Sequence, residues 1–192
     1  NALAGATIGL FYTEGKEPVM TVISGEDGTF SFNNIPYGEY VVREIEAPEA
    51  YVMDETPYTV NIDKNGAVVE IEITNKLIHG NVQLTKVDKD YPDHHLSGAT
   101  FEVYQGDKLI GTMEELADGV YEMDNLEYGE YYLKETKAPE GFYLDEGTYT
   151  FFIKENGKTV IVENEAGHGF INKAQVGDIR IDSYYWGEET EF

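Results

Sequence analysis

Residues 131–142 read YYLKETKAPEGF, and this stretch decides the fold. Its first half is rich in aromatic and aliphatic residues and ends at a proline and a glycine, which predicts a β-strand closed by a turn. Side chains two positions apart share a face of a strand, so Tyr131, Leu133 and Glu135 point the same way. The pattern either buries a carboxyl group, which then needs a partner, or leaves Glu135 at the exposed end of the strand.

The composition narrows the classes of partner. The chain has 192 residues, with 37 acidic side chains against 13 Lys and Arg, and its net charge is −24. Such a surface repels phosphate backbones and anionic lipids, so we predict no binding to nucleic acid or to a membrane. The chain has no Cys, so no disulfide is possible. The acidic and histidine residues from Asp88 to His95 fit no metal-ligand spacing and are interpreted as a solvated turn, so we predict no metal and no cofactor.

Two long segments of the chain repeat each other. The matches include LAGAT at 3–7 with LSGAT at 96–100, YGEY at 37–40 with YGEY at 128–131, and Asn-Lys at 75–76 with Asn-Lys at 172–173. The offset is 91 residues in the middle of the repeat (128 − 37) and 97 at its end (172 − 75). The second copy therefore carries extra residues, which we place near residues 165–169.

Each copy predicts short strands separated by turn sequences such as Asp-Gly, Tyr-Gly and Asn-Gly. No segment has a convincing helical pattern. Regular short strands at this spacing favour an all-β fold made of tandem antiparallel β-sandwiches, each with two sheets. The strands predicted in the first copy are Thr7–Tyr12, Thr29–Phe32, Tyr40–Glu44, Tyr58–Ile62 and Val68–Ile73.

The repeat divides the chain into three parts. We predict that residues 1–76 are a domain without its first strand, that 77–174 are a complete domain, and that 175–192 begin a possible third. The last part opens with a predicted strand at 177–181, and Ser183 takes the place that Lys86 has in the second copy (86 + 97 = 183). Residues 184–186 (YYW) either continue that strand or form a platform for a sugar. Because the chain starts without Met, in the middle of a unit, we interpret it as an interior segment.

The second copy supplies partners for Glu135. Alternation in the run VQLTK at 82–86 puts Lys86 on the same face as two aliphatic side chains. In the last strand, Asn172 shares a face with Phe170. Three polar groups then face the core of one small sandwich, which is costly unless they meet.

These motifs resemble those of a known family. Residues 133–142 are similar to the E-box of Gram-positive pilins, and Lys86-x-Asp88, the run LSGATF at 96–101 and Asn172 complete the pattern of a CnaB-type (collagen-adhesin B-repeat) domain. The resemblance covers residues 80–174 fully, and 1–76 apart from the first strand. It implies a reverse-Ig, prealbumin-like sandwich with a spontaneous Lys–Asn isopeptide bond. Lys86 is then the nucleophile, Asn172 the electrophile and Glu135 the catalytic acid.

The chemistry is also reasonable on physical grounds. Burial disfavours both the ammonium and the carboxylate form, so Lys86 can become neutral and Glu135 protonated. A neutral Lys86 can attack the Asn172 amide carbon while Glu135 passes a proton to the departing ammonia, and the fold supplies the proximity. The alternative is a buried Lys86–Glu135 salt bridge with Asn172 as a hydrogen-bond donor.

The first copy departs from the pattern. Glu44 and Asn75 correspond to Glu135 and Asn172, but Ile45 replaces Thr, Ala50 replaces Gly and the Lys partner is absent. We therefore expect no crosslink there unless another strand supplies an amine. In the second copy, Asn164 is a less favoured electrophile than Asn172.

We predict that the chain is a structural stalk or shaft module of an extracellular, cell wall-anchored adhesin or pilin of a Gram-positive bacterium. Its partners are then adjacent domains of the same surface protein or pilus. The alternative is a binding module for a host matrix protein or glycan on the same fold. We do not predict an enzyme, because the only chemistry indicated is directed at the chain itself and occurs once.

Overall fold

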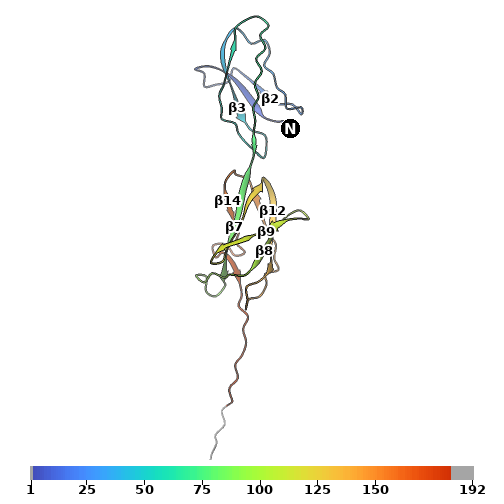
Figure 1. Cartoon of the computed structure of the whole chain (residues 1–192). Helices are drawn as coiled ribbons and strands as arrows, with labels where there is room; N and C mark the ends of the chain where they lie inside the picture. Colours follow the sequence, from blue (N-terminus) through green and yellow to red (C-terminus); the bar gives the residue numbers. More distant parts are fainter. Residues whose placement is uncertain (1, 183–192) are drawn as a thin grey trace, which may run out of the picture.

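The computed structural model describes residues 2–182, which form fifteen β-strands and no helix. The predicted all-β fold is confirmed. The same residues contain no helix with the length and apolar character needed to cross a membrane. Figure 1 shows two groups of strands, one following the other along the chain. We call residues 2–77 the first unit and residues 78–174 the second unit.

The first unit has one four-stranded antiparallel sheet in the order β2-β1-β3-β5, and a two-stranded sheet of β4 and β6. Alternating apolar side chains of β1 and β3, among them Ile8, Leu10, Tyr40 and Val42, are buried against each other and form its core. The strands of this unit are β1 (Thr7–Tyr12), β2 (Met20–Ile23), β3 (Gly38–Glu46), β4 (Tyr51–Val52), β5 (Tyr58–Ile62) and β6 (Lys76–Leu77).

Two strand predictions for the first unit are wrong. Residues 29–32 and 68–73 have strand-like sequences, but neither segment forms a strand in the structure. In the second unit, the matching segments pair with β7 (His79–Asp88), which lies between them. A strand is stable only with a neighbour, and the described residues place no strand equivalent to β7 in the first unit.

The second unit is a β-sandwich. One sheet has the order β10-β11-β7-β14, with β15 also on β7, and the other has the order β13-β12-β8-β9. Buried side chains of both sheets, such as Leu84, Phe101 and Leu133, interdigitate in a single core. Its strands are β7 (His79–Asp88), β8 (Thr100–Gln105), β9 (Lys108–Thr112), β10 (Glu114–Ala117), β11 (Val120–Glu127), β12 (Gly129–Lys137), β13 (Tyr149–Ile153), β14 (Thr159–Ile161) and β15 (Phe170–Asn172).

The pairing of β7 is not purely antiparallel. It runs antiparallel to β11, but β14 and β15 both run parallel to it. Near its end, Lys86 lies opposite Phe170 and Asp88 lies opposite Asn172. The first and last strands of this unit are therefore direct neighbours, although 81 residues lie between them (89–169).

The two units join through a very short connection. Only Ile78 separates β6 from β7, and its amide N donates to the carbonyl of Ala50 in the first unit. Tyr128 of the second unit also contacts the first unit: its hydroxyl donates a hydrogen bond to Glu49 Oε1 at 2.8 Å. The connection is thus a single residue, since Leu77 ends β6 and His79 begins β7.

Residues 175–182 leave the second unit as an extended segment (Figure 1). Val176, Ile179 and Ile181 are exposed there, and the strand predicted at 177–181 is not formed. Ser183 and the YYW run at 184–186 lie outside the described residues. The division into domains at 76 and 174 stays a prediction.

Candidate functional site

Lys86 is fully buried in the core of the second unit, with none of its surface exposed. Alternation along β7 turns it inward together with Val82 and Leu84. Its Nζ donates to the carbonyl of Phe170 at 2.9 Å and, more weakly, to that of Val87 at 3.4 Å. The Nζ also lies 5.7 Å from the centre of the Phe170 ring. The amine is therefore removed from water, and removal from water disfavours its charged form.

Glu135 approaches from the opposite sheet and is 3% exposed. It follows Tyr131 and Leu133 on the inner face of β12, as the alternation predicts. Its Oε2 accepts a hydrogen bond from the main-chain N of Asp145 at 2.8 Å. The turn after β12 therefore fixes the carboxyl group in the core.

Asn172 lies at the end of β15 and is also 3% exposed. Its Nδ2 donates to Glu135 Oε1 and Oε2, at 2.9 and 2.8 Å. Its Oδ1 is buried and has no hydrogen-bond partner among the described residues. Because Phe170 lies opposite Lys86 in the parallel pair, Asn172 is only two residues further along the strand that Lys86 contacts.

Burial moves the proton affinities of the two ionisable groups in opposite directions. Desolvation lowers the pKa of Lys86 from 10.5 to about 8, and the nearby carboxylates of Glu135, Asp145 and Asp88 oppose this only in part. Desolvation also raises the pKa of Glu135, against the hydrogen bonds from Asp145 and Asn172 and the charge of Lys86. Both shifts favour the uncharged forms, a neutral amine and a protonated carboxyl group.

The hydrogen bonds of Lys86 and Glu135 go to different partners. Lys86 donates to main-chain carbonyls, and Glu135 accepts from Asn172 and Asp145. A salt bridge between the two would direct the Nζ of Lys86 at the carboxylate. Among the described contacts, no hydrogen bond joins Lys86 Nζ directly to the Glu135 carboxyl group.

Asp145 is a part of the site that the sequence reasoning missed, and Asn164, which the sequence offered only as a less favoured electrophile, has a structural role there. The Asp145 carboxylate accepts from the Tyr149 hydroxyl and from Asn164 Nδ2, at 2.8 and 2.6 Å. Asn164 also exchanges two hydrogen bonds with the main chain of Ile171, at 2.7 and 2.8 Å. Asn164 thus anchors β15 directly at Ile171, and the Asp145 carboxylate holds the Asn164 amide in place. The repeat could have indicated Asp145, because Asp54 occupies the matching position in the first copy, 91 residues earlier (145 − 54).

The first unit contains a copy of half of this site. Glu44 is buried on β3, and its Oε2 accepts from the Asp54 main-chain N and from Asn75 Nδ2, both at 2.6 Å. Its Oε1 is buried and has no partner among the described residues. The carboxyl and amide groups are brought together as predicted, and no lysine lies with them in the described contacts.

The acidic and histidine residues of 88–95 do not form a metal centre in the structure. Asp88 is buried and its carboxylate accepts from the main-chain N of Asp90 at 2.9 Å, which is a turn contact. Within residues 2–182, no group of three or more His, Cys, Asp or Glu side chains has a geometry that would hold a metal ion.

Comparison with known proteins identifies the family. The chain matches the family described as "SpaA: Prealbumin-like fold domain" over residues 1–77 and 80–167. These two stretches cover most of the 192 residues, so the chain belongs to this family. Its prealbumin-like sandwich agrees with the sheets of the second unit. None of the curated proteins matches the chain.

Several solved structures are similar to this chain. The Bacillus anthracis TIE protein has a TM-score of 0.77 and 30% identity, and the match covers 91% of this chain and 31% of that one. The chain thus spans about a third of that protein. The minor pilin GBS52 of Streptococcus agalactiae gives a TM-score of 0.41 and 19% identity, with 96% and 88% of the two chains covered. BcpA, the major pilin subunit of Bacillus cereus, gives a TM-score of 0.42 and 16% identity, and the match covers 91% of this chain and 96% of that one.

Proposed function

We propose that this chain is a structural module of a Gram-positive surface adhesin or pilus, and that its second unit is a CnaB-type domain closed by a Lys86–Asn172 isopeptide bond. The observation that carries the proposal is the burial of Lys86, Glu135 and Asn172 in one core, with both pKa shifts toward the neutral forms. A core of this kind gains nothing from three polar groups unless they act on one another.

The reaction needs no outside reagent. The lone pair of a neutral Lys86 Nζ attacks Cγ of Asn172, and the carbonyl electrons move onto Oδ1. The bond from Cγ to Nδ2 then breaks, an N–H proton of the lysine passes to the departing nitrogen, and ammonia leaves. One secondary amide replaces one amine and one primary amide.

Glu135 is the group that would carry the proton. It already contacts the amide nitrogen that departs, at 2.8 and 2.9 Å, so a protonated carboxyl group can deliver a proton there and accept one from the lysine. A half-turn of the Asn172 amide would instead bring the unpartnered Oδ1 toward Glu135. The carboxyl group could then donate to the oxygen on which negative charge develops.

The position of the bond suits a module under tension. It would tie β7 to β15, the first and last strands of the unit, which already run parallel side by side. Force entering near residue 79 and leaving near residue 174 would then pass through one amide rather than through the sandwich. An amide is not cleaved by reduction, and the chain has no Cys to supply a disulfide in its place.

The proposal includes location and partners. A cell wall-anchored, extracellular setting and contacts with adjacent domains of the same surface protein or pilus follow from the proposed role. Binding of a host matrix protein or a glycan stays a prediction from the sequence.

Peptide mapping tests the bond directly. Proteolysis of the purified chain should release a branched peptide in which the segment around Lys86 is joined to the segment around Asn172. Two separate linear peptides in its place would contradict the proposal. A branched peptide joining Lys86 to Asn164 would assign the bond to the other asparagine.

A further inference from the structure

A closed ring of hydrogen bonds joins the proposed proton carrier of the second unit to the strand that holds the proposed electrophile. The main-chain N of Asp145 donates to Glu135 Oε2 at 2.8 Å, and the Asp145 carboxylate accepts from Asn164 Nδ2 at 2.6 Å. Asn164 Oδ1 accepts from the main-chain N of Ile171 at 2.7 Å. The next residue, Asn172, returns to Glu135 Oε2 at 2.8 Å. Glu135 and Asn172 are therefore linked by a second route besides their direct contact.

The Asn164 side chain takes the place of a neighbouring strand beside β15. This strand has three residues, and within residues 2–182 it pairs in a sheet with β7 alone. An edge strand leaves main-chain N–H and C=O groups unpaired. A side-chain amide has the same donor and acceptor as a peptide group, and Asn164 directs both at Ile171, at 2.8 and 2.7 Å. The amide thus fixes β15 on the side away from β7.

Tyr149 holds Asp145 and β15 together. Its hydroxyl donates to both Asp145 carboxyl oxygens, at 3.0 and 2.8 Å, and the main-chain N of Gly147 donates to Oδ1 at 2.7 Å. Desolvation, with a further contribution from Asp145, raises the pKa of Tyr149 to about 12, so the hydroxyl stays a donor. The Tyr149 ring packs edge-on against Phe170, whose carbonyl Lys86 contacts, with the ring centres 4.9 Å apart. One group of side chains therefore supports both ends of the ring.

The contacts also distinguish the two asparagines of the site. Both polar atoms of the Asn164 amide are occupied, by Ile171 and Asp145. The Oδ1 of Asn172 has no partner among the described residues. During attack on an amide, its oxygen gains negative charge and its nitrogen must leave, so an amide engaged at both atoms is a poor electrophile. Asn164 is therefore suited to hold the strand, and Asn172 to react.

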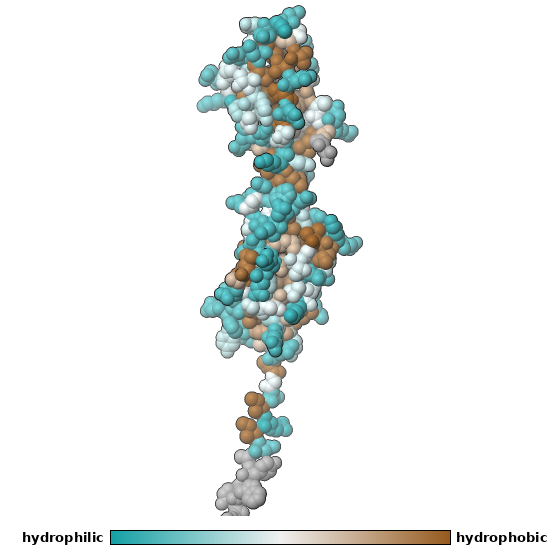
Figure 2. Space-filling model, in the orientation of Figure 1, coloured by the Kyte–Doolittle hydropathy of each residue, from teal (hydrophilic) through white to brown (hydrophobic). Residues whose placement is uncertain are grey.

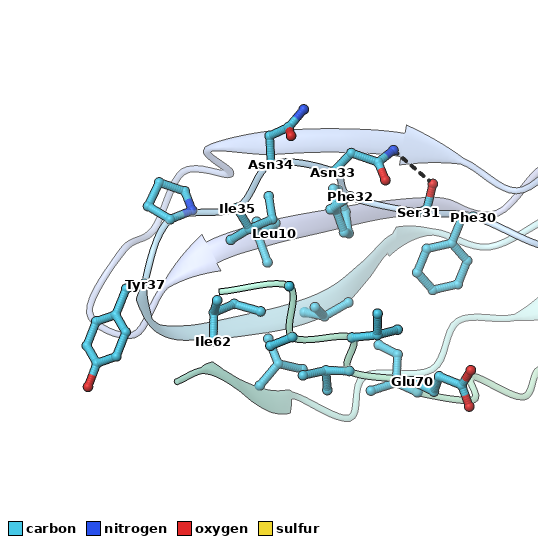
Figure 3. Close-up of a pocket in the computed structure, with 18 of the residues that line it drawn as sticks. Leu10, Phe30, Ser31, Phe32, Asn33, Asn34, Ile35, Tyr37, Ile62 and Glu70 are labelled. Carbon is cyan, nitrogen blue, oxygen red and sulfur yellow. Dashed lines mark hydrogen bonds between the residues drawn. The ribbon is translucent and has the colours of Figure 1, made fainter. Parts of the chain in front are cut away.

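The first unit has no counterpart of the Asn164 link. The two offsets of the repeat match Asn164 to Ile73 (164 − 91) and Ala67 (164 − 97), and neither has an amide side chain. The segment that leads to Asn75 forms no strand, and its residues 68–72 line an opening in this unit (Figure 3). Figure 2 shows hydrophobic surface on this unit, at the top of the view. Asn75 is therefore not clamped as Asn172 is.

The amide of Asn75 also makes different contacts. Asn75 is half-buried, and its Nδ2 donates to one oxygen of Glu44 at 2.6 Å and to the carbonyl of Val52 at 3.0 Å. In the second unit, Asn172 directs its Nδ2 at both oxygens of Glu135. The unit that contains the ring thus presents its amide to the carboxyl group alone.

We propose that Asp145 and Asn164 are positioning residues of the crosslinking site, which hold β15 where Asn172 meets both Lys86 and Glu135. This inference rests on the reaction proposed for the second unit. Neither residue takes part in bond making. Without the link, β15 keeps its pairing with β7 but Asn172 can shift, and a displacement of about 1 Å at a reacting group costs on the order of 100-fold in rate.

The test compares the rates at which the full 192-residue chain and its variants lose ammonia. Chain from a short pulse of cell-free synthesis is quenched in acid at intervals and weighed intact. Asn164→Ala should slow the loss on the order of 100-fold. The matched control is Glu163→Ala, because the Glu163 carboxylate holds the main-chain N of Gly167 in the same loop at 2.7 Å and has no described hydrogen bond to the ring. This control should react at the wild-type rate.

An exchange of the two side chains separates positioning from a general loss of structure. Asn164→Asp alone places two carboxylates together, and Asp145→Asn alone places two amides together, so each should slow the reaction. The double variant rebuilds a donor and acceptor pair with its direction reversed, and it should react faster than either single variant. Recovery should be partial, since Asp at position 164 offers no donor to the Ile171 carbonyl. The main-chain N of residue 145 stays available to Glu135 throughout.

Stability is measured separately, by thermal unfolding in a Lys86→Met background that cannot crosslink. A purely structural role would lower the Tm of Asn164→Ala there but leave its rate of ammonia loss unchanged. Equal rates for wild type and Asn164→Ala would overturn the positioning role and leave the bond itself standing. So would a double variant no faster than the single ones, or a Glu163→Ala chain as slow as Asn164→Ala. A wild-type chain that never loses ammonia would contradict the proposed function, and the positioning role with it.

Discussion

Asn172 donates from one nitrogen to both carboxyl oxygens of Glu135, at 2.9 and 2.8 Å. The amide nitrogen that must leave in the proposed reaction is therefore already in contact with the group that would protonate it. Lys86 approaches from the neighbouring strand, with its Nζ on the carbonyl of Phe170. This arrangement makes distinct predictions for each member of the site.

Replacing Glu135 with Ala should leave the second unit folded but abolish loss of ammonia. The substitution removes the proton carrier and leaves the reacting pair, Lys86 and Asn172, in place. Circular dichroism should show the β-sheet signal, and intact mass should equal the sequence mass. The matched control is Glu44→Ala, which should keep the loss of one ammonia. Full crosslinking in Glu135→Ala would show that Glu135 has another role.

The two units should differ in resistance to protease. A bond between residues 86 and 172 closes a loop of 86 residues (172 − 86), and a disulfide over such a loop contributes about 4–5 kcal/mol through the unfolded state. We expect no such bond in the first unit, whose core is open between residues 28–37 and 64–72. Limited proteolysis with mass mapping should find early cuts within residues 2–77. Early cuts inside residues 82–172 with the first unit intact would contradict the prediction that the second unit is the more resistant of the two.

An uncrosslinkable variant should gain stability in alkali. In Asn172→Ala the buried Lys86 stays an amine, and its pKa in the folded chain is lowered to about 8 from the usual 10.5. Between these values the unfolded chain binds more protons than the folded one, so the free energy of unfolding rises with pH. Urea titrations of the second unit from pH 8 to 10.5 measure this slope. Adding Lys86→Met should flatten it, and equal slopes with and without Lys86 would contradict the predicted burial cost.

Ala50 is a site for stabilising the first unit. It adopts φ = 73°, whereas its counterpart in the second unit is Gly141, with φ = 83°. A residue with a Cβ atom costs roughly 1–2 kcal/mol in this left-handed region, and glycine avoids that cost. Part of the benefit is offset, because glycine loses more conformational entropy on folding than alanine does. Ala50→Gly should therefore stabilise the first unit by about 0.5–1 kcal/mol in thermal unfolding. Gly141→Ala is the matched control and should destabilise the second unit, and a loss of stability in Ala50→Gly would contradict the argument.

The sequence predicted the elements that depend on local alternation. The strands Thr7–Tyr12 and Tyr58–Ile62 have the predicted bounds, and the period of two correctly placed Lys86 and Glu135 on inner faces. The structure now adds contacts that no periodicity contains. The main-chain N of Asp145 holds Glu135, and it comes from a turn ten residues away.

The failures concern elements whose structure depends on a distant neighbour. Residues 29–32 and 68–73 have the composition of strands, yet they lack the pairing strand that β11 and β14 have in β7. The parallel direction of β14 and β15 was also not predicted, because alternation is the same in parallel and antiparallel strands. Strand pairing is a property of the assembled sheet, and it cannot be obtained from one segment at a time.

Intact mass of the purified chain is the most direct test of the central claim. If Lys86 and Asn172 are joined, the chain should be lighter than its sequence mass by one molecule of ammonia, and Lys86→Arg should restore the full mass. Loss of two molecules would mean that Asn75 of the first unit has also found an amine. A wild-type mass equal to the sequence mass would contradict the isopeptide bond.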